Sequence, residues 1–196
     1  DITVDLRDGN FDPFLESAMQ GVWDNTPVGP DVLKVGVTPK YFSIEDAAND
    51  ISQFRLFTGM SVGAMSFSIA PNQMVTSTMS MMGKDMTISG TGKTVTAATI
   101  SQPFDSYSGD LAIGNVASSS AIATVTSIDF SINNELNPTF VVGDDATPFL
   151  ESGMATVEGT FTAYFEDETL INRFINEVES ELIVNVDDPT GANTYS

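Results

Sequence analysis

Neighbouring carboxylates are the residues with the clearest potential for chemistry, and they occur at 144–145, 166–168 and 187–188. Acid–base catalysis by a carboxylate pair needs two carboxyl groups that face one cleft from separate elements. The groups here are instead adjacent in the sequence, within predicted turns. We interpret them as solvated turn residues, or as negative charge at a helix N-terminus.

Two further segments resemble parts of ligand-binding loops. Residues 89–94 read like the end of a phosphate-binding loop, but Thr87 stands where its first glycine is needed and no amphipathic helix follows. Residues 8–12 begin like a calcium loop, but its sixth position is Pro13 and its twelfth is Met19. We interpret the first as a hairpin tip and the second as a turn before a helix. The sequence therefore predicts no catalytic residue, no cofactor, no metal site and no enzyme.

The composition excludes further classes of function. The 196 residues include 27 Asp and Glu, 7 Lys and Arg, and neither Cys nor His, for a formal net charge of −20. Disulfides, thiolate nucleophiles and imidazole bases are therefore excluded. The strong negative charge argues against specific nucleic-acid binding, which requires cations to neutralise phosphates. No apolar run reaches the roughly 18 to 20 residues of a transmembrane helix, so we expect no membrane partner.

Two short helices are predicted. The first spans about 13–20, with Asp12 as N-cap, Pro at the first helical position and Gly21 as the stop. The second spans about 168–179 behind Asp167, and it is amphipathic. We expect its apolar stripe to lie on a sheet; the stripe consists of Leu170, Ile171, Phe174, Ile175 and Val178.

The rest of the sequence alternates with period two, which predicts β-strands. Apolar and polar residues alternate over 155–165, as expected for a strand with one buried face. Residues 65–69 and 128–132 alternate in the same way, and the last long strand covers 182–186. The protein is therefore expected to be mainly β.

A long hairpin is predicted from residues 60–69 and 74–82, which flank a turn at 70–73. The turn sets a register in which Met65 opposes Met79, and the Ser and Thr residues of the two strands oppose each other on the other face. The alternation shifts at Gly63 and Ala64, which predicts a β-bulge.

No charged residue occurs from position 56 to 83, and this leaves two interpretations of the hairpin. Its strands are either buried in the core of the chain, or they extend beyond that core and pair with neighbouring subunits. Depletion of charge and enrichment of Met are typical of such interfaces. The candidate interface residues are Met60, Met65, Phe67, Ile69, Val75, Met79 and Met81.

Residues 41–45 (Tyr-Phe-Ser-Ile-Glu) and 53–60 (Gln-Phe-Arg-Leu-Phe-Thr-Gly-Met) resemble the middle of phage major tail tube proteins of long-tailed, siphovirus-like phages. In that family a long hairpin follows, as residues 62–85 do here. Residues 127–134 and 153–167 also resemble the family. These segments occur in the order found in the family and span most of the chain.

The resemblance implies a two-sheet β-sandwich or barrel of the tail-tube type, with one flanking helix and a short N-terminal helix. It implies one tail-tube domain over residues 1–196, with trimmed ends, because family members have further chain on both sides. It implies a structural virion protein, of which six copies form a ring and the rings stack into a hollow tube. The tube would surround the tape-measure protein, contact tail-tip and tail-terminator proteins, and conduct viral DNA during ejection. We therefore expect it in the virion tail and, during assembly, in the host cytoplasm.

Two polar strand faces are predicted, one within residues 66–80 and one within residues 156–162, and either of them would line the lumen of such a tube. A polyanionic wall repels phosphate, so DNA would pass without specific binding. For each row of residues the alternative is an ordinary solvated strand face. The candidate lumen-facing residues are Ser66, Ser68, Thr76, Thr78, Ser80, Thr156, Glu158, Thr160 and Thr162.

The alternative function is a monomeric β-sandwich binding module or a surface-layer subunit. A sugar-binding module would present aromatic residues on one face, but Trp23 is the only Trp. We expect Trp23 to attach the first helix to the sheet. Residues 24–30 and 93–107 are candidates for contacts between subunits or rings.

Overall fold

The computed structural model describes residues 1–24, 31–95, 101–108, 110–115, 118–121, 125–164, 168–190 and 194–195. Within these residues the fold is mainly β with two helices, as predicted, and no helix is long and apolar enough to cross a membrane. The helices are α1 (Asp12–Met19) and α2 (Thr169–Ile175). The strands are β1 (Ile2–Asp5), β2 (Phe42–Ala48), β3 (Gln53–Ile69), β4 (Thr76–Met82), β5 (Asp85–Ser89), β6 (Asp110–Asn115), β7 (Ser118–Ala121), β8 (Val125–Asn133), β9 (Asn137–Thr139), β10 (Phe149–Glu151), β11 (Thr156–Ala163), β12 (Glu181–Asp187) and β13 (Thr194–Tyr195).

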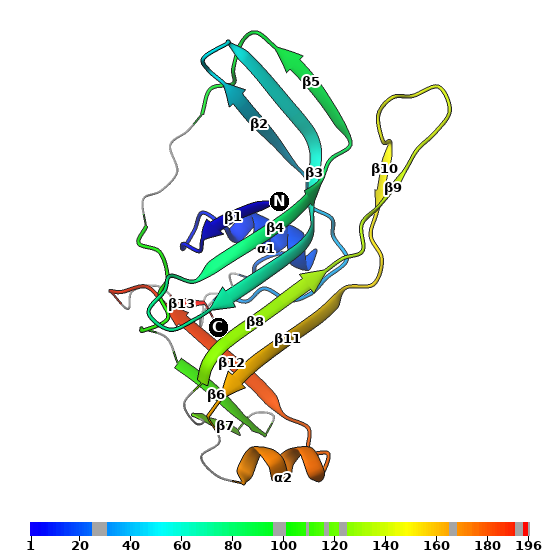
Figure 1. Ribbon diagram of the computed structural model, residues 1–196. Coiled ribbons are helices and arrows are strands. Elements are labelled where there is room, and N and C mark those ends of the chain that lie inside the picture. The colour runs from blue at the N-terminus through cyan, green and yellow to red at the C-terminus, as the bar shows by residue number, and fades with distance from the viewer. Residues whose placement is uncertain are drawn as a thin grey trace.

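Strand β3 organises the larger sheet because it is 17 residues long and pairs with different strands along its length. Its second half lies between β4 and β8, which gives the order β1-β4-β3-β8-β11. Its first half pairs with β2 and β5 and extends away from the rest of this sheet (Figure 1). A second sheet among the described residues has the order β13-β12-β6-β7, and β9 pairs with β10. The two larger sheets give the sandwich architecture that was expected.

The β3–β4 hairpin has the predicted register. Met65 lies opposite Met79, and Ser66 lies opposite Thr78. The register shifts between Val62 and Ala64, which confirms the predicted bulge. One register therefore places apolar residues on one face and small polar residues on the other.

The hydrophobic core lies on the apolar face of β3 and β4. This face is covered by side chains of β1, of the segment that joins β1 to α1, of α1 itself and of β12. Phe104 is completely buried in the same core. The most completely buried apolar side chains of the hairpin are Val62, Met65, Val75 and Met79, each at most 2% exposed.

This core corrects part of the predicted subunit interface. Met65, Phe67, Val75 and Met79 are buried within the chain itself, so they offer no surface to a neighbouring subunit. Ile69 and Met81 are half-buried and pack against the same core, and Met60 is also half-buried. The absence of charge in the hairpin thus reflects burial for these four residues, which was the first of the two interpretations.

Helix α1 begins one residue earlier than predicted. Asp12 is its first residue and not its N-cap, and the N-cap, Phe11, makes no side-chain capping hydrogen bond. The Asp12 carboxylate instead accepts a hydrogen bond from the Tyr195 hydroxyl. The helix ends at Met19 and its C-cap is Gln20, whose φ of 50° is left-handed, while the predicted stop Gly21 donates its N–H to the Glu16 carbonyl.

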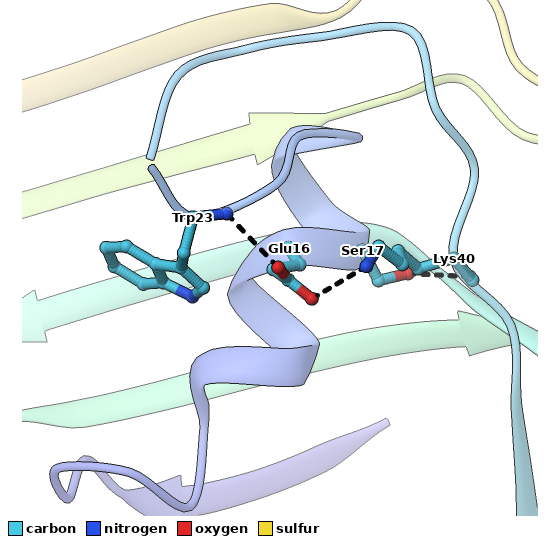
Figure 2. Close-up of polar contacts among 4 residues, drawn as sticks. All are labelled: Glu16, Ser17, Trp23 and Lys40. Atoms are coloured by element: carbon cyan, nitrogen blue, oxygen red, sulfur yellow. Dashed lines mark hydrogen bonds and ion pairs between the residues drawn. The ribbon is translucent and has the colours of Figure 1, made fainter. Parts of the chain in front are cut away.

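Polar contacts attach α1 to the larger sheet and to Trp23 and Lys40, and those with Trp23 and Lys40 are drawn in Figure 2. The Ser17 hydroxyl accepts the Val62 N–H at 3.1 Å and lies 3.1 Å from the Lys40 carbonyl oxygen. The Glu16 carboxylate accepts the Trp23 N–H at 3.2 Å and forms an ion pair with Lys40 at 3.0 Å. The hydrogen bond with Lys40 lowers the pKa of Glu16 against the opposing effect of burial. Trp23 also packs against the core, so it attaches the helix to the sheet as predicted.

The C-terminal half of the chain differs more from prediction. Helix α2 ends at Ile175 instead of near 179, and Asp167 lies outside the described residues. Its apolar stripe is not covered, since Phe174 is 85% exposed and Ile175 is 66% exposed. Strand β11 is exposed on both faces because it ends the strand path and the core lies over β4, β3 and β8. The predictions of a covered helix and a half-buried strand were therefore wrong.

Candidate functional site

Strand β8 lies between β3 and β11 and joins the two predicted polar strand faces, within residues 66–80 and 156–162, into one surface. Ser66 of β3 lies opposite Thr78 of β4 on one side and Ser131 of β8 on the other. Ser131 in turn lies opposite Glu158 of β11, and Thr78 lies opposite Thr3 of β1. Directly opposed residues of paired strands project from the same face of a sheet. This row therefore crosses five strands, and the Thr3 and Thr78 hydroxyls meet at 2.9 Å.

A second row runs beside the first, two residues further along each strand. Asp5 of β1 lies opposite Thr76 of β4, which lies opposite Ser68 of β3. Ser68 lies opposite Asp129 of β8, which lies opposite Thr160 of β11. The Ser68 hydroxyl donates a hydrogen bond of 2.6 Å to the Asp129 carboxylate. The five strands lie side by side in Figure 1.

The same pairing places all nine candidate lumen-facing residues on this surface, which we call the polar face. The remaining three are Ser80 opposite Ala64, Thr156 opposite Asn133, and Thr162 opposite Ser127. The polar face comprises Thr3, Asp5, Ser66, Ser68, Thr76, Thr78, Ser80, Ser127, Asp129, Ser131, Asn133, Thr156, Glu158, Thr160 and Thr162.

The polar face has a consistent chemistry. Its charged members are the carboxylates Asp5, Asp129 and Glu158, and it includes no Lys or Arg. Short hydroxyl side chains surround these carboxylates, and the centre of the face is a shallow groove. No group of three or more carboxylates in the described parts of the chain could hold a metal ion. The face therefore offers negative charge and small polar groups over a broad area, without a site built for one ligand.

Sequence reasoning missed the contribution of β1 to this face. Residues 2–5 read Ile-Thr-Val-Asp, so the alternation that predicts a strand was present but short. The alternation around Asp129 and Ser131 was recognised in the sequence. The sequence did not indicate that these two residues connect the polar residues of the hairpin to those of β11. That link depends on pairings of β8 with β3 and β11, which are distant in the sequence.

Comparison with known protein families matches residues 1–196 to the family described as phage tail tube protein. The chain belongs to the phage tail tube family. No curated protein sequence matches it. The match covers the whole sequence and confirms the resemblance found in the residues.

Membership makes the chain a structural protein of the phage tail, a virion component that assembles with other virion proteins. Of the described carboxylate pairs, 144–145 is exposed and agrees with the interpretation as solvated turn residues, whereas Asp187 ends β12 and Asp188 is only 4% exposed, so that interpretation was wrong for 187–188. Asp144 accepts the Ala146 N–H at 3.1 Å, and Asp188 accepts both the N–H and the hydroxyl of Thr190. Of the third group, 166–167 lie outside the described residues.

The two segments predicted to contact other subunits are only partly described. Residues 25–30 and 96–100 lie outside the described part of this tail tube protein. Within the second segment Phe104 is fully buried in the core, where its N–H donates to the Leu6 carbonyl at 2.9 Å. Phe104 is therefore a core residue and not a contact residue.

Three carboxyl groups of the tail tube protein cluster beside Tyr195. Burial raises the pKa of Asp8, and the nearby charges of Asp12 and Asp188 raise it further. Burial, followed by the hydrogen bond to Asp12, raises the pKa of Tyr195. At neutral pH the cluster therefore holds charge at a cost to stability.

We expect Asp8→Asn to raise the melting temperature at pH 7. The folded chain binds the Asp8 proton more tightly than the unfolded chain, where Asp titrates near 3.9. Ionisation of Asp8 therefore lowers the free energy of unfolding as the pH rises through both pKa values. The gain should disappear as the pH falls towards about 3, because both states are then protonated. Thermal unfolding at several pH values measures this, with exposed Asp50→Asn as the control. An equal or lower melting temperature at pH 7 would contradict the prediction.

Proposed function

We propose that the polar face lines the lumen of a hollow tail tube in which six copies form each ring and the rings stack. The observation that carries this proposal is the polar face itself, which crosses five strands and holds three carboxylates without a cation. The phosphates of a passing DNA would meet repulsion at every point of such a wall. A broad uniform surface of this kind suits a conduit.

The ends of the strand path support closure of a ring. Strand β1 begins this path and β11 ends it, so the two strands present edges on opposite sides of one sheet. An exposed edge pairs readily with another strand, and joining each β11 to the β1 of the next copy would close a continuous barrel. Such a head-to-tail contact produces a ring when its rotation closes. The polar face of each copy would then continue into that of the next.

This function assigns roles to the wider tail. The tube would surround the tape-measure protein during assembly in the host cytoplasm, and it would meet the tail-tip and tail-terminator proteins at its ends. DNA would pass through it during ejection without specific binding. Residues 1–196 would act as one tail-tube domain.

Electron microscopy of the concentrated protein, with light scattering on the same sample, tests the proposal. Hollow six-fold rings or tubes are expected. Monomeric particles under all concentrations and salt conditions would favour the alternative of a monomeric β-sandwich binding module.

We expect Glu158→Lys to disturb DNA passage without unfolding the protein. Glu158 is exposed on β11 and lines the groove of the polar face, so the exchange costs the fold little. Six lysines per ring would attract the phosphates that the wall otherwise repels. Phages with this substitution should form tails and lose infectivity at least about tenfold, the rate change that 1.4 kcal/mol produces. Glu151→Lys, at an exposed residue of β10, is the matched control. Normal infectivity of the Glu158 variant would argue against its lumenal position.

A further inference from the structure

The hairpin of β9 and β10 ends in an exposed apolar loop. Phe140 is 75% exposed, Val141 is 43% exposed and Val142 is fully exposed, and we call these three residues the apolar tip. The base of the loop is held, because the Thr147 N–H donates to the Lys84 carbonyl at 2.8 Å and Thr147 is buried. The tip is thus an apolar projection on an anchored base.

A second apolar feature lies between α2, β11 and β12. A groove there has an apolar floor, and we call it the α2 groove. Its charged rim consists of Arg173, Glu177 and Glu181. Arg173 also donates hydrogen bonds to the Ser180 hydroxyl and the Glu179 carbonyl. The apolar residues of the groove are Phe161, Leu170, Phe174, Val178 and Leu182.

The tip and the groove lie at opposite ends of the molecule. The hairpin connects β8 to β11 at one end of these strands, and α2 follows β11 at the other end (Figure 1). A contact between tip and groove can therefore form only between two copies that are displaced along the strands. Such a contact is heterologous and repeats from copy to copy. In a barrel the strands are tilted by about 35 to 45° from the axis, so this displacement has a component along the tube.

We propose that the apolar tip of one copy binds the α2 groove of a second copy in the adjacent ring. This inference rests on the proposed ring and names the surfaces that stack it. The tip exposes roughly 400 Å² of apolar surface, given about 150 to 250 Å² for one aromatic side chain. A stable pair of proteins needs about 800 Å² on each partner. One contact is therefore weak, and the same contact repeated around a ring gives stable stacking by multivalency.

The charges near the contact make its strength depend on salt. Asp144 and Asp145 follow the tip, and Glu177 and Glu181 line the groove, so that carboxylates approach one another against the single cation Arg173. Salt screens such repulsion and leaves apolar burial intact. Stacking of rings should therefore increase with ionic strength.

A cysteine pair tests the contact directly, because the chain contains no Cys. The double variant Val142→Cys and Phe174→Cys is assembled under reducing conditions and then oxidised. A ladder of dimers, trimers and longer chains is expected on a non-reducing gel, since each copy contributes one tip and one groove. The control pairs Val37→Cys, on a valine that is 89% exposed, with Phe174→Cys. A ladder no stronger than that of this control would overturn the proposal, and so would dimers alone.

Charge variants separate this contact from ring formation. Val142→Asp and Phe174→Asp should each leave rings intact and reduce the mass of stacked tubes at least about tenfold, the effect of 1.4 kcal/mol. Combining Val142→Asp with Phe174→Lys should restore tubes. Normal tubes from either single variant would overturn the proposed contact. Failure of the unaltered protein to form rings would instead contradict the proposed function.

Discussion

Replacing Val157 with lysine is expected to abolish ring formation and leave a folded monomer. Val157 lies on the apolar face of β11, opposite the buried Ile132, yet it is itself 59% exposed. In the proposed ring the β1 of the next copy would pair with the edge of β11, and the core that underlies that β1 would then lie against this face. A lysine there would lose its hydration without gaining a partner, and charged side chains on edge strands are a known barrier to edge pairing.

The effect on assembly should greatly exceed the effect on the fold. An exposed site tolerates exchange within about 0.5 kcal/mol, so thermal unfolding of the monomer should hardly change. A buried unpaired charge costs several kcal/mol at each contact, which shifts a contact equilibrium by more than about tenfold. Sedimentation and electron microscopy of the variant measure the loss of rings.

Val22→Lys is the matched control for this substitution. Val22 follows α1 and is 58% exposed, so it has the same residue type and nearly the same exposure away from both sheet edges. Rings from the control and none from the Val157 variant are expected. Rings from both would show that β11 does not form the proposed contact.

The sequence predicted what depends on neighbouring residues. The β3–β4 register followed from one turn and a period of two, and the bulge at Gly63 followed from the shift in that period. Helix α1 was placed to within one residue by its proline and by the glycine after it. Its N-cap was assigned wrongly because Asp12 binds Tyr195, a partner 183 residues away.

The polar face could be predicted only in pieces. Each row of Ser and Thr is visible in the sequence, but the face exists because β8 pairs with β3 on one side and β11 on the other. Local periodicity contains no information on such pairing, since it reports only which residues share a face of one strand. The same limit explains why the prediction of a covered α2 was wrong. The apolar stripe of α2 indicates a face that becomes buried, but it does not indicate whether this chain or another copy covers that face.

Charge depletion in the hairpin could not separate core from interface, because both environments exclude charge. The structure separates them by exposure. Met65 is completely buried and lies opposite Met79 on one side and Ile132 on the other. Met86 of β5, in the sheet extension, is 46% exposed. These two methionines therefore provide a direct comparison within one chain.

Met65→Ala is expected to lower the free energy of unfolding by about 2 to 5 kcal/mol, because it removes buried side-chain atoms and leaves a cavity that a packed core fills incompletely. Met86→Ala should cost at most about 0.5 to 1 kcal/mol, as is usual for exposed sites. Urea unfolding of the monomer measures both, since the midpoint shifts with stability while the slope reports the surface exposed on unfolding.

The comparison also tests the assignment of Met65 to the core. A core residue stabilises the monomer, so its truncation shifts the urea midpoint before any subunit contact is involved. An interface residue would leave the monomer unchanged and weaken only the rings. If Met65→Ala leaves the urea midpoint unchanged and abolishes rings, Met65 would have to be assigned to a subunit contact instead of the core. A large shift in the midpoint would instead leave the free edges, the apolar tip and the α2 groove as the surfaces available for assembly.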